Sequence, residues 1–333
     1  MRADFRPCWQ NDLRVKVDMH TITLINGDGI GKEVIPATEQ ILLALNLPLE
    51  LRYAQAGFGT FEQVGDALPK ETIQACETSD AVLFGATQSP MGKVEGYISP
   101  ILSLRRRFNL FANLRPALKG DIDMLVVREN TEGMYSGRER VEADGQIAIL
   151  ERVITAGASE RITRVACEQA MTRQRKLTIV HKANVLKETC GLFRRVAFEV
   201  TAKYPDLQVE EMLVDAAAMF MAQNPARFDV IVTTNLFGDI LSDLAAGLTG
   251  GLGIAPSANI GVDGFAVFEP VHGSAPDIAG KGIADPRAAF LSASMMLDYL
   301  RYADPAQKLR SVVYDTPHTG TTSGTTEAVL ARL

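Results

Sequence analysis

Short apolar runs alternate with amphipathic stretches along most of this chain. Runs rich in β-branched and aliphatic residues, bounded by polar residues, predict buried strands, and apolar residues at helical spacing predict the helices between them. The predicted strands cover residues 21–26, 79–85, 123–127, 176–180, 211–214 and 229–234. The predicted helices cover residues 32–45, 159–172, 185–202, 216–223 and 288–302, and one more begins near 239. The pattern indicates an α/β protein, in which helices cover the faces of a sheet.

Three segments interrupt this pattern. Residues 141–154 are predicted to be extended with a turn at 144–145, so we expect a hairpin that projects from the body. Residues 265–282 are predicted to form a long loop rich in small residues, which exposes backbone amides as a phosphate-bearing cofactor requires. Residues 27–31 have a Gly-x-Gly-x-Gly spacing, which differs from the dinucleotide fingerprint and is typical of a plain strand-to-helix turn.

Polar residues directly follow four of the predicted strands. Arg128, Lys182 and Asp215 each stand at such a strand end, and Asn235 and Asp239 follow a fourth. Open α/β sheets bind their ligands at the carboxyl ends of the strands. We therefore expect one edge of one sheet to carry the active site.

Asp239 and Asp243 are four residues apart, so they lie on the same face of the predicted helix. Helix capping is the alternative interpretation, because unpaired amides and the dipole favour a carboxylate near a helix start. Capping explains Asp239 alone but not a second carboxylate one turn later, which repels the first. Together with Asp215, the pair favours a hard divalent cation, Mg²⁺ or Mn²⁺, which takes oxygen ligands.

Three arginines are candidates for binding a polycarboxylate: Arg105, Arg115 and Arg128. Guanidinium groups pair with carboxylates through two parallel hydrogen bonds. A solvated basic helix face is the alternative and accounts well for Arg106 and Arg107. It suits Arg115 less, because apolar residues flank that position.

The composition narrows the classes of protein. A chain of 333 residues predicts two domains, or one large unit with a lobe. Hydrophobic residues at 47% and charged residues at 22% are ordinary for a globular enzyme. A net charge of −6 and a pI near 5.4 argue against nucleic acid as a partner. The apolar runs are too short for a membrane span.

The cysteines and the N-terminus indicate a cytoplasmic protein. Cys8, Cys76, Cys167 and Cys190 are scattered without metal-ligand spacing, which suits a reducing compartment. Residues 1–20 have no apolar signal-peptide core and are predicted to be a loose extension.

Six motifs give the chain a specific resemblance. They read NGDGIG, LFANLRP, RENTEGMYSG, HKANVLK, NLFGDILSD and EPVHGSAPDIAGKGIADP. Together they resemble the signatures of the β-decarboxylating dehydrogenases, which include isocitrate, 3-isopropylmalate, homoisocitrate and tartrate dehydrogenases. The resemblance runs from about Thr21 to the C-terminus.

The resemblance implies a two-domain α/β fold of the isocitrate/isopropylmalate dehydrogenase type, which is not a Rossmann fold. Mixed sheets flanked by helices and a dimer clasp are expected. Residues 1–20 form the extension, residues 21–110 and 251–333 the large domain with the NAD site, and residues 111–250 the small domain with the dimer interface, metal and catalytic residues. The active sites lie in a cleft and are shared in a homodimer or tetramer.

The same resemblance implies residue roles. The residues that bind the substrate are Ser99, Arg105, Arg115, Arg128, Tyr135 and Lys182. Tyr135 is the proton donor, Lys182 and Asp215 come from the partner subunit, and Asp215, Asp239 and Asp243 surround Mg²⁺ or Mn²⁺.

The resemblance also implies an NAD site. Its residues are Asn184, Glu269, His272, Gly273, Ser274, Ala275, Asp277, Ile278 and Asp285. The charge of Asp277 selects NAD, because it accepts from a ribose hydroxyl and repels the 2′-phosphate of NADP. One departure is Asp285, which stands where relatives often have asparagine at the adenine contact.

The implied reaction is the oxidative decarboxylation of a 2-hydroxy-3-carboxy acid. The segment before Arg105 reads SPMGKVEGYISPILSLRRRF and most resembles homoisocitrate enzymes, with Arg106 or Lys93 available for the distal carboxylate. We expect homoisocitrate to be converted to 2-oxoadipate and CO₂. The alternatives are isocitrate, 3-isopropylmalate and tartrate. A non-catalytic regulatory subunit is the alternative of another class, but such subunits lose catalytic groups that this chain retains.

Overall fold

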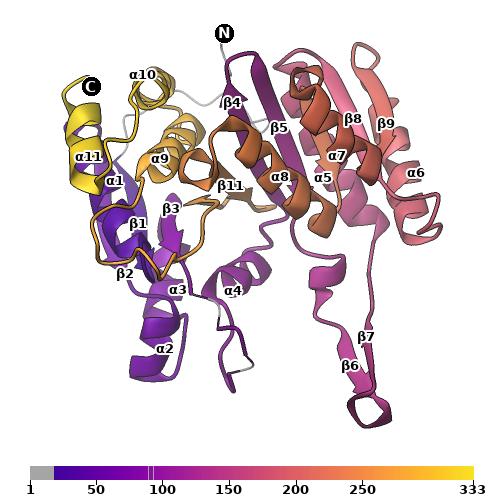
Figure 1. Cartoon of the computed structure of the whole chain (residues 1–333), viewed down its shortest axis with the longest axis horizontal. Coiled ribbons are helices and arrows are strands. Elements are labelled where there is room, and N and C mark those ends of the chain that lie inside the picture. Colours follow the sequence, from indigo (N-terminus) through magenta and orange to yellow (C-terminus); the bar gives the residue numbers. More distant parts are fainter. Residues whose placement is uncertain (1–18, 89, 93) are drawn as a thin grey trace. The chain divides into compact units, whose positions relative to one another are not determined.

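The structure is a computed structural model that describes residues 19–88, 90–92 and 94–333 (Figure 1). The described residues divide into two compact units. Unit 1 is Asn109–Thr249, and unit 2 comprises residues 19–108 and 250–333. Lys93, Cys8 and positions 1–18 of the predicted extension lie outside the described residues.

Unit 2 contains five strands in the order β2-β1-β3-β12-β11. Their bounds are β1 His20–Gly27, β2 Leu49–Ala54, β3 Ala81–Ala86, β11 Pro256–Ile260 and β12 Ala266–Pro270. The first four in this order run parallel, and β11 pairs antiparallel with β12. The sheet of this unit is therefore mixed, as predicted.

The helices of unit 2 are α1 Gly31–Ala44, α2 Phe58–Val64, α3 Lys70–Glu77, α4 Pro100–Arg107, α9 Arg287–Tyr299, α10 Ala303–Tyr314 and α11 Thr322–Leu330. Helices α1 and α9 pack on the sheet and on each other. Every residue of α9 from 288 to 297 is buried, and a helix that is apolar nearly all round belongs inside a protein. Helix α10 packs on α9 and α11 packs on α1, so both cover the inner pair.

Unit 1 contains five strands in the order β4-β5-β10-β8-β9. Their bounds are β4 Ala112–Lys119, β5 Ile122–Glu129, β8 Lys176–His181, β9 Gln208–Leu213 and β10 Val230–Thr233. Its helices are α5 Ala156–Met171, α6 Thr189–Thr201, α7 Val214–Gln223 and α8 Asn235–Thr249. Helix α8 packs on β4 and β5, and α7 packs on β8 and β9. Buried Met124, Val126, Ile231 and Leu241 form part of the core between these helices and the sheet.

The strand register in unit 1 brings the predicted strand ends into one row. Strands β5, β10, β8 and β9 are parallel neighbours. Thr233 is paired with Arg128 on one side and Val180 on the other, and His181 is paired with Leu213. Residues that follow these strands therefore lie at the same edge, as the sequence predicted.

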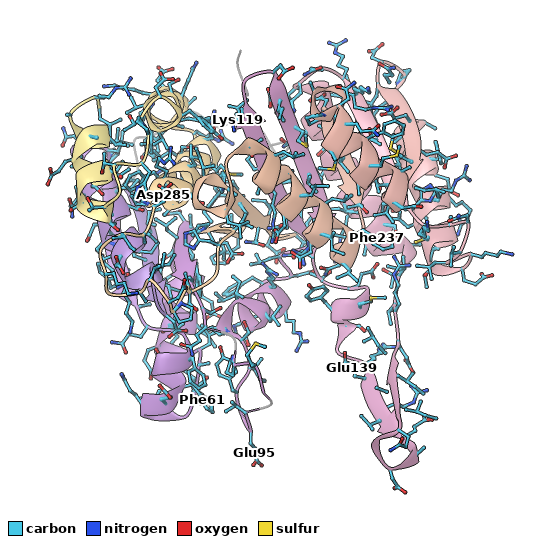
Figure 2. All side chains as sticks on the ribbon, viewed as in Figure 1. Phe61, Glu95, Lys119, Glu139, Phe237 and Asp285 are labelled. Atoms are coloured by element: carbon cyan, nitrogen blue, oxygen red, sulfur yellow. The ribbon has the colours of Figure 1, made fainter. Side chains whose placement is uncertain are left out.

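Strands β6 Glu139–Glu142 and β7 Ile147–Leu150 form the predicted hairpin, with the turn at Ala143–Gly145. Figure 1 shows that it extends away from the rest of unit 1. Figure 2 shows its side chains, including Glu139, on both sides of the ribbon, and most of them are exposed. An isolated two-stranded hairpin is marginal in water, so this one needs other contacts for stability.

Two parts of the sequence prediction are wrong or incomplete. Residues 266–270 belong to strand β12 and not to the loop predicted over 265–282, because three of these five residues are apolar and buried. The strands β2, β4 and β11 were not predicted, and β4 in particular carries Asn113, Arg115 and Pro116 in place of an apolar run. None of the helices in the described part of the chain has the length and apolar character needed to cross a membrane.

Candidate active site

Arg128 is the centre of a charged cluster at the edge of the unit 1 sheet. Arg128 is only 1% exposed. Its Nε and Nη2 donate to Asn235 Oδ1 at 3.1 and 2.7 Å. Its Nη1 donates to Asp239 Oδ1. Gly238 permits this packing, because a Cβ there would lie 2.6 Å from Arg128 Cγ. Helix α8 can therefore begin directly against the arginine.

Arg115 bridges the two aspartates of α8. Its Nη1 lies 3.3 Å from Asp239 Oδ1 and 3.1 Å from Asp243 Oδ1. The sequence argument assigned the relief of their mutual repulsion to a cation, but in this structure a guanidinium provides it. Asn113 Oδ1 and Ser242 Oγ, both 2.8 Å from Arg115 nitrogens, orient the group. Sequence reasoning missed both, because the motifs LFANLRP and NLFGDILSD contain these residues without indicating that either side chain contacts Arg115.

Tyr135 completes the cluster. Its hydroxyl donates to Asp239 Oδ2 at 2.7 Å, and the Arg128 guanidinium lies over its ring at 5.3 Å. Burial, with the hydrogen bond to Asp239, raises the pKa of Tyr135 above its ordinary value. The phenol therefore keeps its proton and can act as an acid. We call Arg115, Arg128, Tyr135, Asp239 and Asp243 the aspartate–arginine cluster.

Asp243 is the more accessible of the two carboxylates. Burial raises its pKa and Asp239 adds to that effect, whereas Arg115 opposes it. A bound divalent cation would favour the ionised form of both groups. In this structure the carboxylates of Asp239 and Asp243 are therefore neutralised by arginines.

Lys182 and Asp215 form a second, separate pair at the same edge. Lys182 Nζ donates to Asp215 Oδ1 at 2.5 Å, and this hydrogen bond lowers the pKa of the Asp215 carboxyl. Asp215 follows β9, and Asp239 follows β10, which lies two strands away in the sheet. Neighbouring strands are about 4.8 Å apart, so roughly 10 Å separates the ends of β9 and β10. No three acidic, histidine or cysteine side chains among the described residues gather into a metal site. Within the described residues of one chain the three aspartates therefore do not meet, and the expectation that Asp215 of a partner subunit joins Asp239 and Asp243 stays a prediction.

Arg105 and Glu269 form a buried ion pair in unit 2. Arg105 Nη2 donates to Glu269 Oε1 at 2.9 Å, and Asn259 Nδ2 donates to the same oxygen at 2.9 Å. Arg105 Nε is buried without a hydrogen-bond partner. Sequence reasoning assigned Arg105 to the substrate and Glu269 to NAD, and the structure joins them. Glu269 and Asn259 therefore orient the arginine.

Replacing Glu269 by glutamine is expected to raise the KM of the acid substrate about tenfold, because a charge-assisted hydrogen bond to Arg105 becomes a neutral one. The KM of NAD should change much less. Steady-state kinetics with each substrate varied in turn measures both values. Glu327→Gln, at an exposed position of helix α11, is the matched control. An increase confined to the KM of NAD would contradict this role.

Two further residues predicted to bind the substrate, Ser99 and Arg106, lie on or next to helix α4. Ser99 is the N-cap residue of α4, but its side chain makes no capping hydrogen bond. Arg106 is exposed on α4, whereas the neighbouring Arg107 pairs with Glu77.

The loop after β12 carries most of the predicted cofactor residues. Ser274 is buried, and its carbonyl accepts from the backbone amide of Ile30 at 2.9 Å. Gly29 has a φ of +54°, and a Cβ there would lie 2.0 Å from that carbonyl. The turn at 27–31 therefore needs glycine at position 29, because the loop after β12 approaches its backbone closely.

His272 offers a buried, unused polar atom. Its Nδ1 is 3.0 Å from the Gly273 carbonyl, and its Nε2 is buried with no hydrogen-bond partner in the structure. Burial lowers the pKa of His272, so the ring is neutral near pH 7. A neutral imidazole nitrogen can hydrogen bond to a nucleotide.

The remaining cofactor candidates differ in their availability. Gly273 and Asp277 are exposed, and Ala275 and Ile278 are partly exposed. The carboxylate of Asp285 accepts from Arg287 Nη2 at 2.7 Å and from its backbone amide at 3.1 Å, so Arg287 holds it. Asn184 is exposed and belongs to unit 1, unlike the others.

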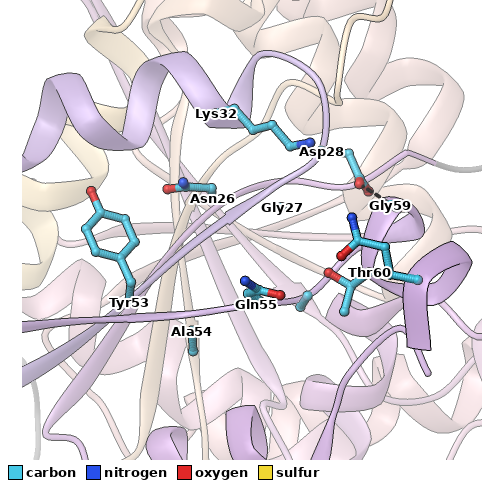
Figure 3. Close-up of a pocket in the computed structure, with 11 residues that line it drawn as sticks. Asn26, Gly27, Asp28, Lys32, Tyr53, Ala54, Gln55, Gly59 and Thr60 are labelled. Carbon is cyan, nitrogen blue, oxygen red and sulfur yellow. Dashed lines mark hydrogen bonds between the residues drawn. The ribbon is translucent and has the colours of Figure 1, made fainter. Parts of the chain in front are cut away.

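A cavity of about 360 Å³ lies elsewhere in unit 2, at the carboxyl ends of β1 and β2 (Figure 3). Its lining residues include Asn26, Lys32, Gln55 and Thr60. Asp28 also lines it, and a dashed line in Figure 3 joins its carboxylate to Gly59. None of these residues was predicted to bind substrate or cofactor.

Comparison with known proteins places this chain and its fold in one class of enzymes. Residues 21–326 match the family model described as isocitrate/isopropylmalate dehydrogenase. The isocitrate/homoisocitrate dehydrogenase of Thermus thermophilus is 52% identical over 332 residues, covering 94% of this chain and 98% of that protein. The 3-isopropylmalate dehydrogenase of Archaeoglobus fulgidus is 52% identical over 307 residues, covering 90% and 91%.

A solved structure agrees with these matches. The crystal structure of isocitrate dehydrogenase from Methylococcus capsulatus superposes with a TM-score of 0.89 at 41% identity, covering 94% of this chain and 99% of that one. The chain belongs to the isocitrate/isopropylmalate dehydrogenase family. It is a decarboxylating dehydrogenase, and the predicted two-domain-type α/β fold class of this family is confirmed, whereas the dimer clasp stays a prediction.

Proposed function

We propose that this enzyme oxidises and decarboxylates a 2-hydroxy-3-carboxy acid with NAD and Mg²⁺ or Mn²⁺, and that homoisocitrate is its preferred acid. The observation that carries the proposal is the aspartate–arginine cluster. It combines two carboxylates, two guanidinium groups and a protonated phenol at one sheet edge. A metal-bound polycarboxylate can use all of these groups: the carboxylates bind the cation, the guanidinium groups bind the acid, and the phenol donates a proton.

The carboxylates fit a divalent metal. Mg²⁺ and Mn²⁺ commonly take one or two carboxylates and complete their coordination with substrate oxygens and water. Asp239 and Asp243 are both partly exposed and on one helix face, so they meet that requirement. When bound, the metal would polarise the 2-hydroxyl group and stabilise the charge that develops on that oxygen. Asp215 would be supplied by a second copy of the chain.

The arginines are available to a bound acid once a metal engages the aspartates. In the structure Arg115 and Arg128 neutralise Asp239 and Asp243. A cation on the carboxylates and the acid's carboxylates on the guanidinium groups would replace these pairs without leaving a buried charge unpaired. We assign Arg105 of unit 2, oriented by Glu269, as the third guanidinium for the acid.

The loop with His272 fits the adenosine half of NAD. The buried Nε2 of His272 lacks a partner, and the exposed Asp277 carboxylate can accept from ribose hydroxyls. The same negative charge would repel a 2′-phosphate, which supports NAD over NADP. When bound, NAD would supply the acceptor for the hydride that leaves C2 of the acid.

The chain's own residues then move the protons. Lys182 or Asp215 of the partner takes the proton of the 2-hydroxyl, directly or through water, as hydride leaves C2. The 2-oxo acid loses its β-carboxylate as CO₂, and the electrons of that bond pass to C3. Tyr135, whose raised pKa keeps it protonated, donates a proton to C3. The products are the 2-oxo acid, CO₂ and NADH, and Tyr135 must then be reprotonated.

Dimerisation through unit 1 would complete the site. Met219 on α7 is 46% exposed and Ile240 on α8 is 57% exposed, an apolar surface suited to a second copy. Val141 and Ile147 on the β6–β7 hairpin are also exposed, and pairing with the same hairpin of a partner would stabilise it. This arrangement would bring Lys182 and Asp215 of one copy to the cluster of the other.

The choice of acid is tested with purified protein, NAD and Mg²⁺. We expect kcat/KM to be highest with homoisocitrate, lower with isocitrate, and lower again with 3-isopropylmalate and tartrate. A similar panel with NADP should give at least about a hundredfold lower kcat/KM, because Asp277 opposes the 2′-phosphate. A preference for 3-isopropylmalate would contradict the choice of acid, and turnover of none would leave the regulatory subunit as the alternative.

A further inference from the structure

Residues 87–99, which we call the substrate loop, connect β3 to α4 and precede Arg105. The proposed choice of acid depends on this segment. Among its described residues, Gln88 is held through both of its backbone groups. Its amide donates to Asp28 Oδ2 at 2.9 Å, and its carbonyl accepts from the Tyr97 hydroxyl at 2.8 Å. The bond between Gln88 and Tyr97 closes the loop on itself near its two ends.

Tyr97 is in turn held by helix α2. Its ring centroid lies 5.3 Å from that of Phe58 and 5.4 Å from that of Phe61, both in edge-on arrangements. Such arrangements are favourable for aromatic pairs. The end of the substrate loop is therefore packed against a regular element as well as bonded to its start.

Asp28 holds the start of the substrate loop. This residue is only 5% exposed, and its carboxylate accepts from the amides of Phe58 at 2.7 Å and Gly59 at 2.9 Å as well as from Gln88. Gly57 allows the approach, since its φ is +128° and a Cβ there would lie 2.6 Å from Asp28 Oδ2. One buried carboxylate thus ties the start of α2 to the start of the substrate loop, and Figure 3 shows its bond to Gly59.

We propose that Asp28 and Tyr97 are positioning residues that set the acid preference of this enzyme by holding the substrate loop at both ends. The inference rests on the proposed function, because it concerns which acid that site accepts. Loop ends that are held in advance lose less conformational entropy when an acid binds, and they keep a fixed position. A loosened loop binds every acid more weakly and distinguishes less between them.

Tyr97→Phe tests the inference, because it removes the hydroxyl and keeps the ring on Phe58 and Phe61. We expect the ratio of kcat/KM between the best and second-best acids to fall about fivefold, as for one lost hydrogen bond. The KM of the acid should rise, while kcat and the KM of NAD stay within about twofold. Tyr53→Phe is the matched control, since its hydroxyl donates to Glu39 at 2.7 Å and makes no hydrogen bond to the part of the substrate loop that the structure describes. An unchanged ratio in Tyr97→Phe, or an equal change in Tyr53→Phe, overturns the proposal.

Hydrogen–deuterium exchange tests the anchoring independently of turnover. The peptide that contains Gln88 should exchange faster in Tyr97→Phe and in Asp28→Asn than in the wild type or Tyr53→Phe. Wild-type exchange rates in both variants would overturn the proposal even if no acid were turned over. If the wild type turns over no acid while the two variants exchange faster, the proposed function fails and the anchoring stands.

Discussion

Asp239→Asn is expected to lower kcat/KM by about a thousandfold, the largest loss for any single change in unit 1. Asp239 contacts Arg115, Arg128 and Tyr135 at once. Asparagine keeps the size and one acceptor oxygen but removes the charge that a divalent cation requires. The change therefore weakens both the binding of the cation and the hydrogen bond that orients Tyr135.

The free energy of unfolding of Asp239→Asn distinguishes a loss of activity from misfolding. Arg128 keeps its two hydrogen bonds to Asn235, and the Asp239 side chain is a third exposed, so the free energy of unfolding should fall by only about 1 kcal/mol. Thermal denaturation measures this change, and titration of Mn²⁺ measures the weaker metal binding. Asp304→Asn on the exposed start of α10 is the control and should retain full turnover. Turnover by Asp239→Asn within tenfold of the wild type would contradict the metal role.

The sequence predicted the parts of this site that depend on local order. Strand ends are read from short apolar runs, and the parallel register then places Arg128, Lys182 and Asn235 at one edge. The four-residue spacing of Asp239 and Asp243 likewise follows from helical periodicity. The hairpin at 139–150 could be predicted because its strands flank a turn with glycine.

Pairings between distant residues could not be predicted in this way. Arg105 and Glu269 are 164 positions apart, and no periodicity relates them. The partner of Asp28 at Gln88 is 60 positions away and is a backbone amide, which has no signature in the sequence. Strand order decides the distance between Asp215 and Asp239, and strand order comes from long-range packing.

Lys182→Met is expected to lower kcat by about a hundredfold or more, as is Tyr135→Phe, because each removes a group that moves a proton. Neither change should unfold the protein. Lys182 is partly exposed and its only described partner is the exposed Asp215, while phenylalanine at 135 keeps the ring near Arg128. Lys187→Met, on the exposed segment before α6, is the matched control for the lysine change.

The central claim is that one site combines the aspartate–arginine cluster of one chain with Lys182 and Asp215 of another. Co-expression of a Tyr135→Phe chain and a Lys182→Met chain with different affinity tags, followed by purification on both tags, isolates the mixed dimer. One of its two sites then holds both changes and the other holds neither, so the mixed dimer should recover about half of the wild-type kcat. If Lys182 served the cluster of its own chain, each site would carry one change, and activity no higher than that of the single variants would contradict the account.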